Sequence, residues 1–253
     1  MNIVHPGFRI ETPLTLGPED VHLWRVDLEV TAGGVAQWLP ILSPDERTRG
    51  SRFHRASDRH YFIAGRAILR QILGAYLDTD PKSVSFAYSE KSKPALGEDH
   101  AGSDLTFNIS HSGTIALLAF ARSRQLGVDV EQIRRDFDTA PIAARFFSQV
   151  EQEELAMLPA DQRNDAFFFC WTRKEAYIKA TGEGLSLPLR QFDVSLAPRS
   201  QSALLATRPD LAECQRWRLR DVAVEPGYAA AICVSGTGWK LVQWSDGSPE
   251  PTE

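Results

Sequence analysis

Cysteine is scarce in this chain of 253 residues, and the three that occur, Cys170, Cys214 and Cys233, lie far apart. They form no CxxC pair, and any pairing among them would leave one thiol over. A disulfide framework or a zinc site is therefore not expected. A reducing cytoplasm is the simplest location for such a chain.

Long apolar runs are also missing, since none approaches the roughly 20 residues that span a bilayer. The N-terminus, MNIVHPGFRIETPL, lacks a basic stretch followed by an apolar core, so no secretory signal is expected. The net charge of −5 argues against non-specific nucleic-acid binding. Neither a membrane nor a nucleic acid is expected as a partner.

Two common catalytic motifs are absent as well, because the chain has neither GxSxG nor GxxxxGK[ST]. Ser110-His111-Ser112 invites a serine-hydrolase interpretation. Neighbours on a strand point to opposite faces, however, whereas a nucleophile must reach its base. We predict that SHSG is a turn between two strands. Its hydroxyls, imidazole and Gly113 suit phosphate oxygens, although a simple capped hairpin turn is the alternative.

The hydrophobic content of 43% and charged content of 24% are typical of a globular protein, and the length suits two modest cores. Ser43 followed by Pro44 predicts a helix start. Further helices are expected at 58–77, 134–148, 149–157 and 166–181, the last capped by Asn164 or Asp165 and ended by Gly182. Strands are expected at 21–30, 84–88, 105–109, 114–121, 126–131, 192–196, 217–222, 228–234 and 239–244.

The chain contains a weak internal echo. Gly74 follows Arg66 by the interval at which Gly182 follows Lys174, and strands follow each long helix. This spacing is compatible with two similar halves. We predict an α+β fold with an N-terminal half at 1–125, a C-terminal half at 126–245, and a disordered tail at 246–253.

Asp129 and Glu131 lie two residues apart in GVDVE. On a strand this spacing puts both carboxylates on one face, roughly 6.6 Å apart. Such carboxylates repel one another unless a cation or proton lies between them. Magnesium, which prefers carboxylate oxygens together with substrate phosphates and waters, is the natural cation. The alternative is a strand end with two hydrated acids.

Glu175 and Lys179 are four residues apart on a predicted helix, and Trp171 lies one turn earlier on the same face. The simple interpretation is an i,i+4 ion pair. The functional one is a third metal ligand or base beside a phosphate-binding ammonium, with further positive charge from Arg173 and Lys174. A basic span at 47–59 is either a solvated helix face or an anion site.

The ordered set FNISHSG, GVDVE and WTRKEAYIKATGEGLSLPL, with Lys93-Pro94 upstream in a polar loop, resembles the phosphopantetheinyl transferases of the surfactin-synthetase type. The motifs cover about Ser43 to Leu189. The resemblance implies a pseudo-dimer of two α+β halves, each a long helix on a small antiparallel sheet. It implies transfer of 4′-phosphopantetheine from coenzyme A to a serine of an apo acyl or peptidyl carrier protein, with Mg²⁺ as cofactor and adenosine 3′,5′-bisphosphate released. A monomer is expected.

The resemblance also implies roles for individual residues. Asp129, Glu131 and Glu175 match the magnesium ligands, and Glu175 is also the expected base. The expected coenzyme A contacts, of which His111 and Lys179 are also expected to assist catalysis, are Arg49, Arg52, Lys93, Pro94, Ser110, His111 and Lys179. The chain departs from the family pattern at Glu46, near which relatives have a lysine, and at Tyr61, where they often have an arginine. Because of these two departures, the resemblance does not fix which basic residues contact the 3′-phosphate.

Two other classes fit the same residues. One is a magnesium-dependent nucleotide or coenzyme A pyrophosphatase, which would use water in place of the carrier serine. The other is a module that binds coenzyme A or a carrier protein without catalysis.

Overall fold

The computed structural model describes residues 10, 13–29, 32–88, 93–197, 203–208, 210–245 and 248–249. Contacts divide the chain into two units. Unit 1 contains Met1–Leu105, Thr114–Arg122 and Lys240–Glu253, and unit 2 contains Thr106–Gly113 and Ser123–Trp239. The division of the chain into domains at residue 125 stays a prediction, because each unit takes segments from both sides of it. In the described part, no helix has the length and apolarity needed to cross a membrane.

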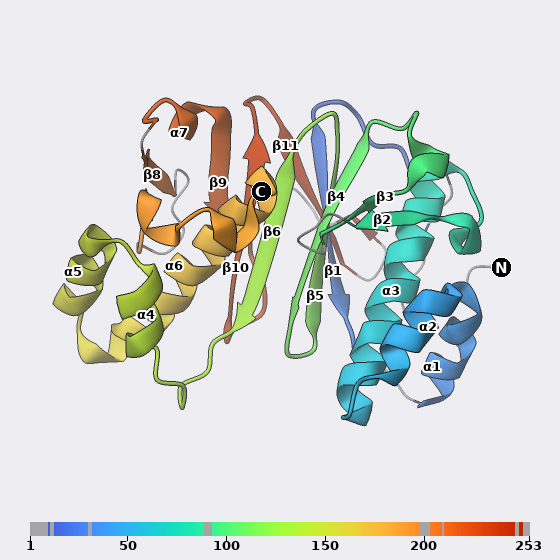
Figure 1. Ribbon diagram of the computed structural model, residues 1–253, viewed down its shortest axis with the longest axis horizontal. Helices are drawn as coiled ribbons and strands as arrows, with labels where there is room; N and C mark the ends of the chain where they lie inside the picture. Colours follow the sequence, from blue (N-terminus) through green and yellow to red (C-terminus); the bar gives the residue numbers. More distant parts are fainter. Residues whose placement is uncertain are drawn as a thin grey trace. The chain divides into compact units, whose positions relative to one another are not determined.

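In unit 1, β1 (Asp20–Asp27) pairs antiparallel with β5 (Ile115–Arg122) and parallel with β11 (Lys240–Ser245). The long helix α3 (Ala56–Leu77) is contacted by α1 (Ala32–Trp38) and α2 (Pro44–Ser51), as Figure 1 shows. A small hairpin joins β2 (Phe86–Tyr88) to β3 (Pro94–Leu96). The predicted helix start at Ser43 is confirmed, because the Ser43 side chain and Glu46 form a reciprocal capping box.

In unit 2, β6 (Leu126–Gln132), β10 (Tyr228–Ser235) and β9 (Trp217–Asp221) form an antiparallel sheet in that order. The long helix α6 (Ala160–Thr181) packs across all three strands (Figure 1). The other elements of the unit are α4 (Ala140–Phe146), α5 (Gln149–Met157), β7 (Phe192–Val194), β8 (Leu204–Thr207) and α7 (Glu213–Arg216). The protein is thus α+β, with two halves that each pack a long helix against mainly antiparallel sheets.

Gly127 lets α6 lie directly on β6. A Cβ atom at this position would collide with the backbone of the helix, at the Ala176 oxygen and the Ala180 nitrogen. Because Gly127 has no side chain, the helix can approach the strand closely. The close approach brings the last turns of α6 next to the carboxylates that follow Gly127.

Two expected helices have the wrong starts. The helix expected at 134–148 begins only at Ala140, and Ser148 instead caps α5. The helix expected from 166 begins at Ala160. Asn164 and Asp165 do not cap it, because their side chains bind the preceding loop: Asn164 donates to the Arg134 carbonyl, and Asp165 pairs with Arg135.

The turn between the two strands is confirmed, but its expected extent, SHSG, is wrong. Strand β4 (Leu105–Ser112) runs through both serines, so of this segment only Gly113 (φ 56°) lies in the turn. Pro94, expected in a loop, begins β3 and pairs with Tyr88. In the tail, Ser248–Pro249 form β12, so disorder is wrong for these two residues, while 246, 247 and 250–253 lie outside the described residues.

Candidate functional site

Strand β4 is joined to β6 by side chains. The backbone N–H groups of Val128, Val130 and Gln132 on β6 donate to side-chain oxygens of Asn108 (2.9 Å), Ser110 (3.4 Å) and Ser112 (3.1 Å), respectively. Alternate polar residues on β4 therefore satisfy one edge of β6, whose other edge pairs with β10. Three polar side chains at a spacing of two thus have a structural reason to occur in FNISHSG.

Ser110 connects this ladder to a buried charge pair. Its hydroxyl donates to Asp129 Oδ1 (2.8 Å) and accepts from Lys179 Nζ (3.0 Å). Lys179 also forms an ion pair with Asp129 Oδ1 at 2.7 Å and donates to the Val128 carbonyl. Asp129 is only 4% exposed. The ion pair of Lys179 is therefore with the strand carboxylate.

Asp129 Oδ2 is a buried oxygen that has no hydrogen-bond partner among the described residues. Leaving a buried carboxylate oxygen unsatisfied costs free energy, so such an atom calls for an explanation. A cation bound at this oxygen would remove the cost.

Glu131 carries the second carboxylate of β6. Its Oε2 accepts from the Ser112 hydroxyl at 2.8 Å. Burial, followed by the negative charge of Asp129, raises the pKa of Glu131, and the Ser112 hydrogen bond opposes the change. The prediction that Asp129 and Glu131 share one face of a strand agrees with this pattern of partners on β4.

The helix contributes Trp171, Glu175 and Lys179, which recur every fourth residue along α6 and line the same pocket. Burial raises the pKa of Glu175 to about 7, with smaller contributions in the same direction from Asp129 and Glu131, and Lys179 opposes them. The three carboxylates are therefore close enough to repel one another electrostatically.

These side chains surround a pocket of about 350 Å³ in unit 2. It is lined by Ile109, Ser110, His111, Asp129, Glu131, Trp171, Glu175 and Lys179. The lining contains all the site residues that the family resemblance implied, apart from Arg49, Arg52, Lys93 and Pro94. The pocket combines oxygen donors with an ammonium and an imidazole, which suits an anionic substrate and a hard cation.

The residues fit a magnesium ion in chemistry but do not enclose one. Among the described residues, no three His, Cys, Asp or Glu side chains are grouped closely enough to hold a metal ion. Magnesium usually binds one or two carboxylates and completes its shell with waters and substrate phosphates. The unsatisfied oxygen of Asp129 and the mutual repulsion of the three acids agree with such a partial site.

Arg173 and Lys174 do not add charge to the pocket, contrary to the prediction from sequence. Both are fully buried. Arg173 pairs with Asp221 at 2.6 Å, and Lys174 pairs with Glu151 at 2.8 Å. These two cations stabilise the interior of unit 2, which leaves Lys179 as the α6 cation that lines the pocket.

The residues expected to contact the nucleotide belong to unit 1. Arg49 and Arg52 are exposed on or just after α2, and the Arg49 guanidinium lies over the Phe62 ring at 5.5 Å. Lys93 and Pro94 are half-buried. Their contacts with a nucleotide stay predictions.

Glu46, one of the departures from the family pattern, has a structural role. Its carboxylate is 2% exposed and accepts from Arg70 at 2.7 Å, with Arg66 at 3.8 Å. The side chain at this position therefore points into unit 1. A phosphate contact from residue 46 is excluded.

Sequence reasoning missed the roles of Asn108 and Ser112. The available signal was the alternation of polar side chains in FNISHS, which marks a strand with one polar face. That signal was lost because the hydroxyl-rich segment was interpreted as a turn.

Two family models match the chain: "4′-phosphopantetheinyl transferase, N-terminal" over residues 31–123 and "4′-phosphopantetheinyl transferase superfamily" over residues 125–233. The 4′-phosphopantetheinyl transferase HetI of Nostoc sp. is 41% identical over 91% of this chain and 94% of its own length. The 4′-phosphopantetheinyl transferase Sfp of Bacillus subtilis is 32% identical, over 79% of this chain and 84% of its own. Among solved structures, the match to the Thermotoga maritima holo-[acyl-carrier-protein] synthase covers 44% of this chain and 62% of that one, with 18% identity and a TM-score of 0.34.

The matches span both long helices and all the motifs around the pocket. The resemblance inferred from those motifs is therefore confirmed, and the chain belongs to the 4′-phosphopantetheinyl transferase superfamily as an Sfp-type, two-domain transferase.

Proposed function

We propose that the unit 2 pocket transfers 4′-phosphopantetheine from coenzyme A to a serine of an apo carrier protein, with Mg²⁺ bound there. The observation that carries this proposal is the convergence of Asp129, Glu175 and Lys179 in one pocket of a chain that belongs to this transferase family. Family membership supplies the reaction. The pocket supplies groups of the right chemistry for a pyrophosphate.

The metal would be held by carboxylates among Asp129, Glu131 and Glu175, with waters and phosphate oxygens completing its shell, because the three are not grouped closely enough in this structure to enclose an ion. Asp129 offers its unsatisfied Oδ2, and Glu131 offers the carboxylate whose other oxygen Ser112 holds. When bound, Mg²⁺ would neutralise negative charge on the pyrophosphate of coenzyme A.

The remaining pocket residues bind and orient the donor. We assign Lys179 and His111 to the pyrophosphate oxygens, with the Ser110 hydroxyl as a further contact. The Lys179 side chain is 28% exposed, and its ammonium is held at the pocket by Asp129. A phosphate that enters the pocket can therefore reach it. Preorganised donors of this kind stabilise charge as it develops.

In the transfer, the hydroxyl oxygen of the acceptor serine attacks the β-phosphorus. A new P–O bond to serine forms, and the P–O bond to adenosine 3′,5′-bisphosphate breaks, with the leaving oxygen keeping the electron pair. Glu175 takes the serine proton. Its place on α6, one turn from Lys179, puts a base beside the phosphate-binding groups.

The test is incubation of the purified protein with coenzyme A, Mg²⁺ and an apo carrier protein, followed by intact-mass spectrometry. We expect one phosphopantetheine added to the carrier, and none to a carrier whose acceptor serine is replaced by alanine. If coenzyme A is hydrolysed while several unrelated carriers stay unmodified, the pocket is that of a pyrophosphatase. Binding without any product would indicate a non-catalytic module.

The cellular setting is also a proposal. We place the enzyme in the cytoplasm, in keeping with its three free cysteines, and we expect a monomer. Light scattering after size-exclusion chromatography would measure the second of these directly.

A further inference from the structure

Two serines of β4 hold the two carboxylates of β6 in the same way. Ser110 donates its hydroxyl hydrogen to Asp129 Oδ1, and Ser112 donates its own to Glu131 Oε2, both at 2.8 Å. Each hydroxyl oxygen also accepts from the backbone N–H that follows its carboxylate, at 3.4 Å for Ser110 and 3.1 Å for Ser112. Each serine therefore ties a carboxylate to the strand backbone beside it.

The third polar residue of this row shows that β6 does not need hydroxyls for its own hydrogen bonds. Asn108 accepts from the backbone N–H of Val128 at 2.9 Å, and Val128 carries no carboxylate. A hydroxyl differs from the amide because its single oxygen can accept from an N–H group and donate to a carboxylate at the same time. Hydroxyls thus lie beside the two acids of β6, and an amide lies where there is no acid.

Glu131 depends on its serine more than Asp129 does. Asp129 is also held by an ion pair with Lys179 at 2.7 Å. Within the described residues, no cation forms an ion pair with Glu131, and its hydrogen bond comes from Ser112. Glutamate has a long side chain that loses much rotamer freedom when it is fixed. Without the hydroxyl, the Glu131 carboxylate would not be held in one direction.

The turn after Ser112 allows this contact. Gly113, the next residue, has a φ of 56°, and a Cβ atom there would lie 2.5 Å from Tyr228 Oη and 3.0 Å from Gln132 Oε1. Tyr228 and Gln132 face each other across β10 and β6. Because Gly113 has no side chain, the end of β4 can approach β6 closely enough for Ser112 to reach Glu131.

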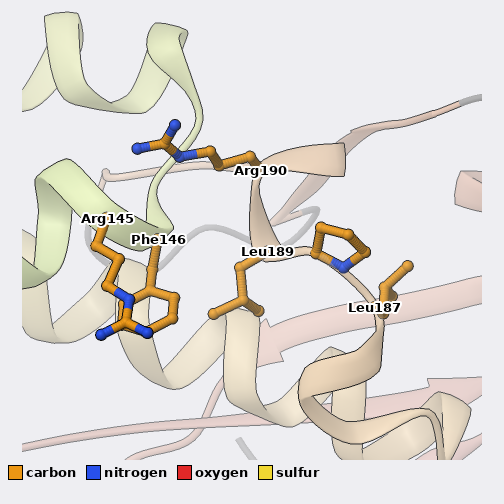
Figure 2. A pocket seen from close by; sticks show the side chains of 6 residues that line it. Arg145, Phe146, Leu187, Leu189 and Arg190 are labelled. Carbon is orange, nitrogen blue, oxygen red and sulfur yellow. The ribbon is translucent and has the colours of Figure 1, made fainter.

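A second cavity of unit 2 offers no comparable ligands. It has a volume of about 220 Å³, and Figure 2 shows its lining, which consists of Arg145, Phe146, Leu187, Pro188, Leu189 and Arg190. Both charged side chains of this lining are arginines, which would repel a divalent cation. A metal ion that binds to unit 2 is therefore expected in the pocket that Asp129 and Glu131 line.

We propose that Ser112 is a positioning residue, whose hydroxyl holds the Glu131 carboxylate ready to bind the metal ion and so sets the affinity for that ion. The inference rests on the proposed function, because it assumes that Mg²⁺ binds at these acids. Ser112 itself is not among the residues that line the pocket. It acts through Glu131, and loss of such a partner of a metal ligand typically costs about 10- to 100-fold in metal affinity.

The experiment measures the binding of Mn²⁺, a paramagnetic substitute for Mg²⁺, by electron paramagnetic resonance with and without coenzyme A. A blank without protein corrects for the metal that coenzyme A itself binds. We expect Ser112→Ala to raise the Kd for Mn²⁺ by about 10-fold. Ser112→Thr keeps the hydroxyl, so its Kd should stay close to that of the parent.

Thr106→Val is the matched control. Thr106 lies on the same face of β4 as Ser112, and its hydroxyl donates to the Arg124 carbonyl at 2.6 Å. The change therefore removes a hydroxyl that binds a backbone carbonyl in place of an acid, and the Kd for Mn²⁺ should stay at the parent value. The thermal midpoint checks the fold of each variant. If Ser112→Ala does not fold, Ser112→Cys, whose thiol is only a weak donor, takes its place.

A double-mutant cycle tests whether Ser112 acts through Glu131. In a Glu131→Gln background, Ser112→Ala should change the Kd for Mn²⁺ by less than about twofold, because the carboxylate that it positions is already gone. A loss as large as in the parent background would overturn the proposal. So would an unchanged Kd in Ser112→Ala, a Ser112→Thr variant that binds as weakly as Ser112→Ala, or an equal rise in Thr106→Val.

Transfer kinetics give an independent check. For Ser112→Ala, the KM for Mg²⁺ should rise by about 10-fold. The kcat at saturating Mg²⁺, and the KM for coenzyme A measured there, should stay near the parent values, because the hydroxyl contacts neither the donor nor the acceptor. A fall in kcat with no change in the KM for Mg²⁺ would overturn the proposal.

Failure of the proposed function would give different results. A parent enzyme that binds no Mn²⁺ removes the metal site, and the role of Ser112 with it. A parent enzyme that binds Mn²⁺ but modifies no carrier protein removes the transfer reaction alone, and the Mn²⁺ measurements on Ser112 then stand.

Discussion

Each unit fixes its long helix with a buried ion pair to a capping glutamate, but only unit 2 also has charged helix residues that line a pocket. In unit 1, Glu46 Oε2 accepts from the Ser43 amide at 3.0 Å and from Arg70 of α3 at 2.7 Å. In unit 2, Glu151 Oε2 accepts from the Ser148 amide and from Lys174 of α6, both at 2.8 Å. A capping box at the start of a short helix thus doubles as the counter-ion of a cation on the long helix.

The likeness extends along both helices, which are each 22 residues long. Arg70 and Lys174 lie about two turns before their helix ends. Each also donates to carbonyls of the segment after its helix: Arg70 to that of Val84, and Lys174 to that of Phe192. Both helices end at a left-handed residue.

The two long helices differ at the residue that follows the ion-paired cation. Where α6 has Glu175 lining the pocket, α3 has the buried Gln71. Where α6 has Lys179, α3 has Ala75. The shared ion pair is therefore scaffolding, and the carboxylate and ammonium that face a pocket are what unit 2 has in addition.

Breaking the scaffold should give the largest effect. Lys174→Met removes the cation paired with the buried Glu151. Arg70→Met leaves the buried Glu46 only the more distant Arg66 at 3.8 Å. Breaking a buried pair in this way typically costs about 3–5 kcal/mol. We expect both variants to lose stability on this scale in denaturant unfolding. Lys240→Met, at an exposed lysine, should stay within about 0.5 kcal/mol of the parent. A loss below about 1 kcal/mol at either buried site would end the comparison, because that pair would not hold its helix.

Exchanging the residues at which the units differ should have the next largest effect. Glu175→Gln removes the proposed base and one metal ligand, so transfer should slow by about 10²-fold or more, while the fold is kept. Carrier modification followed by intact mass measures the rate, and the thermal midpoint checks the fold.

The reciprocal change, Gln71→Glu, is the matched control. It places a carboxylate at the corresponding point of α3, which is only 4% exposed. We expect lower stability, because the buried charge has no cation dedicated to it, and transfer within about threefold of the parent at a temperature where the variant is folded. If Gln71→Glu slowed transfer as much as Glu175→Gln does, position 71 would also matter for transfer, and the proposed difference between the two positions would be wrong.

The local signals in the sequence predicted much of this arrangement. Ser43 and Pro44 predicted α2, and Gly182 predicted the end of α6. The spacing of Trp171, Glu175 and Lys179 predicted one face of a helix, and all three line the pocket. Signals of this kind depend on neighbours within a few residues, so they can be interpreted without the fold.

The failures that concern the site involve partners far along the chain. Lys174 was expected to add positive charge to the phosphate site, because its partner Glu151 is 23 residues away. The internal echo paired Lys174 with Arg66, whereas the structure matches it with Arg70, one turn later. The serines of β4 looked like a turn, because the β6 amides that they bind lie about 20 residues downstream. No local rule identifies Glu151 as the partner of Lys174.

The smallest expected effect is a loss of stability at acid pH that arises in unit 1 and has no counterpart in unit 2. The C-terminal end of α3 rests on a polar cluster, in which Tyr76 Oη pairs with His22 Nδ1 at 2.7 Å and accepts from Trp24 at 3.0 Å. The corresponding part of α6 rests on rings, with Tyr177 packed on Phe192 and Trp217. Burial lowers the pKa of His22 from 6.5 to about 4, although Asp20 opposes the change.

Because the pKa of His22 is lower in the folded protein than in the unfolded chain, the neutral ring favours folding. This contribution is fully present above pH 6.5, and it is lost as the pH falls from 6.5 towards 4, on the order of 2 kcal/mol. His22→Gln removes the titration and keeps a polar side chain. The parent's thermal midpoint should therefore fall more steeply than the variant's between pH 7 and 4.5, by roughly 2–4 °C for each kcal/mol. Parallel curves would show that His22 does not set the acid response of unit 1.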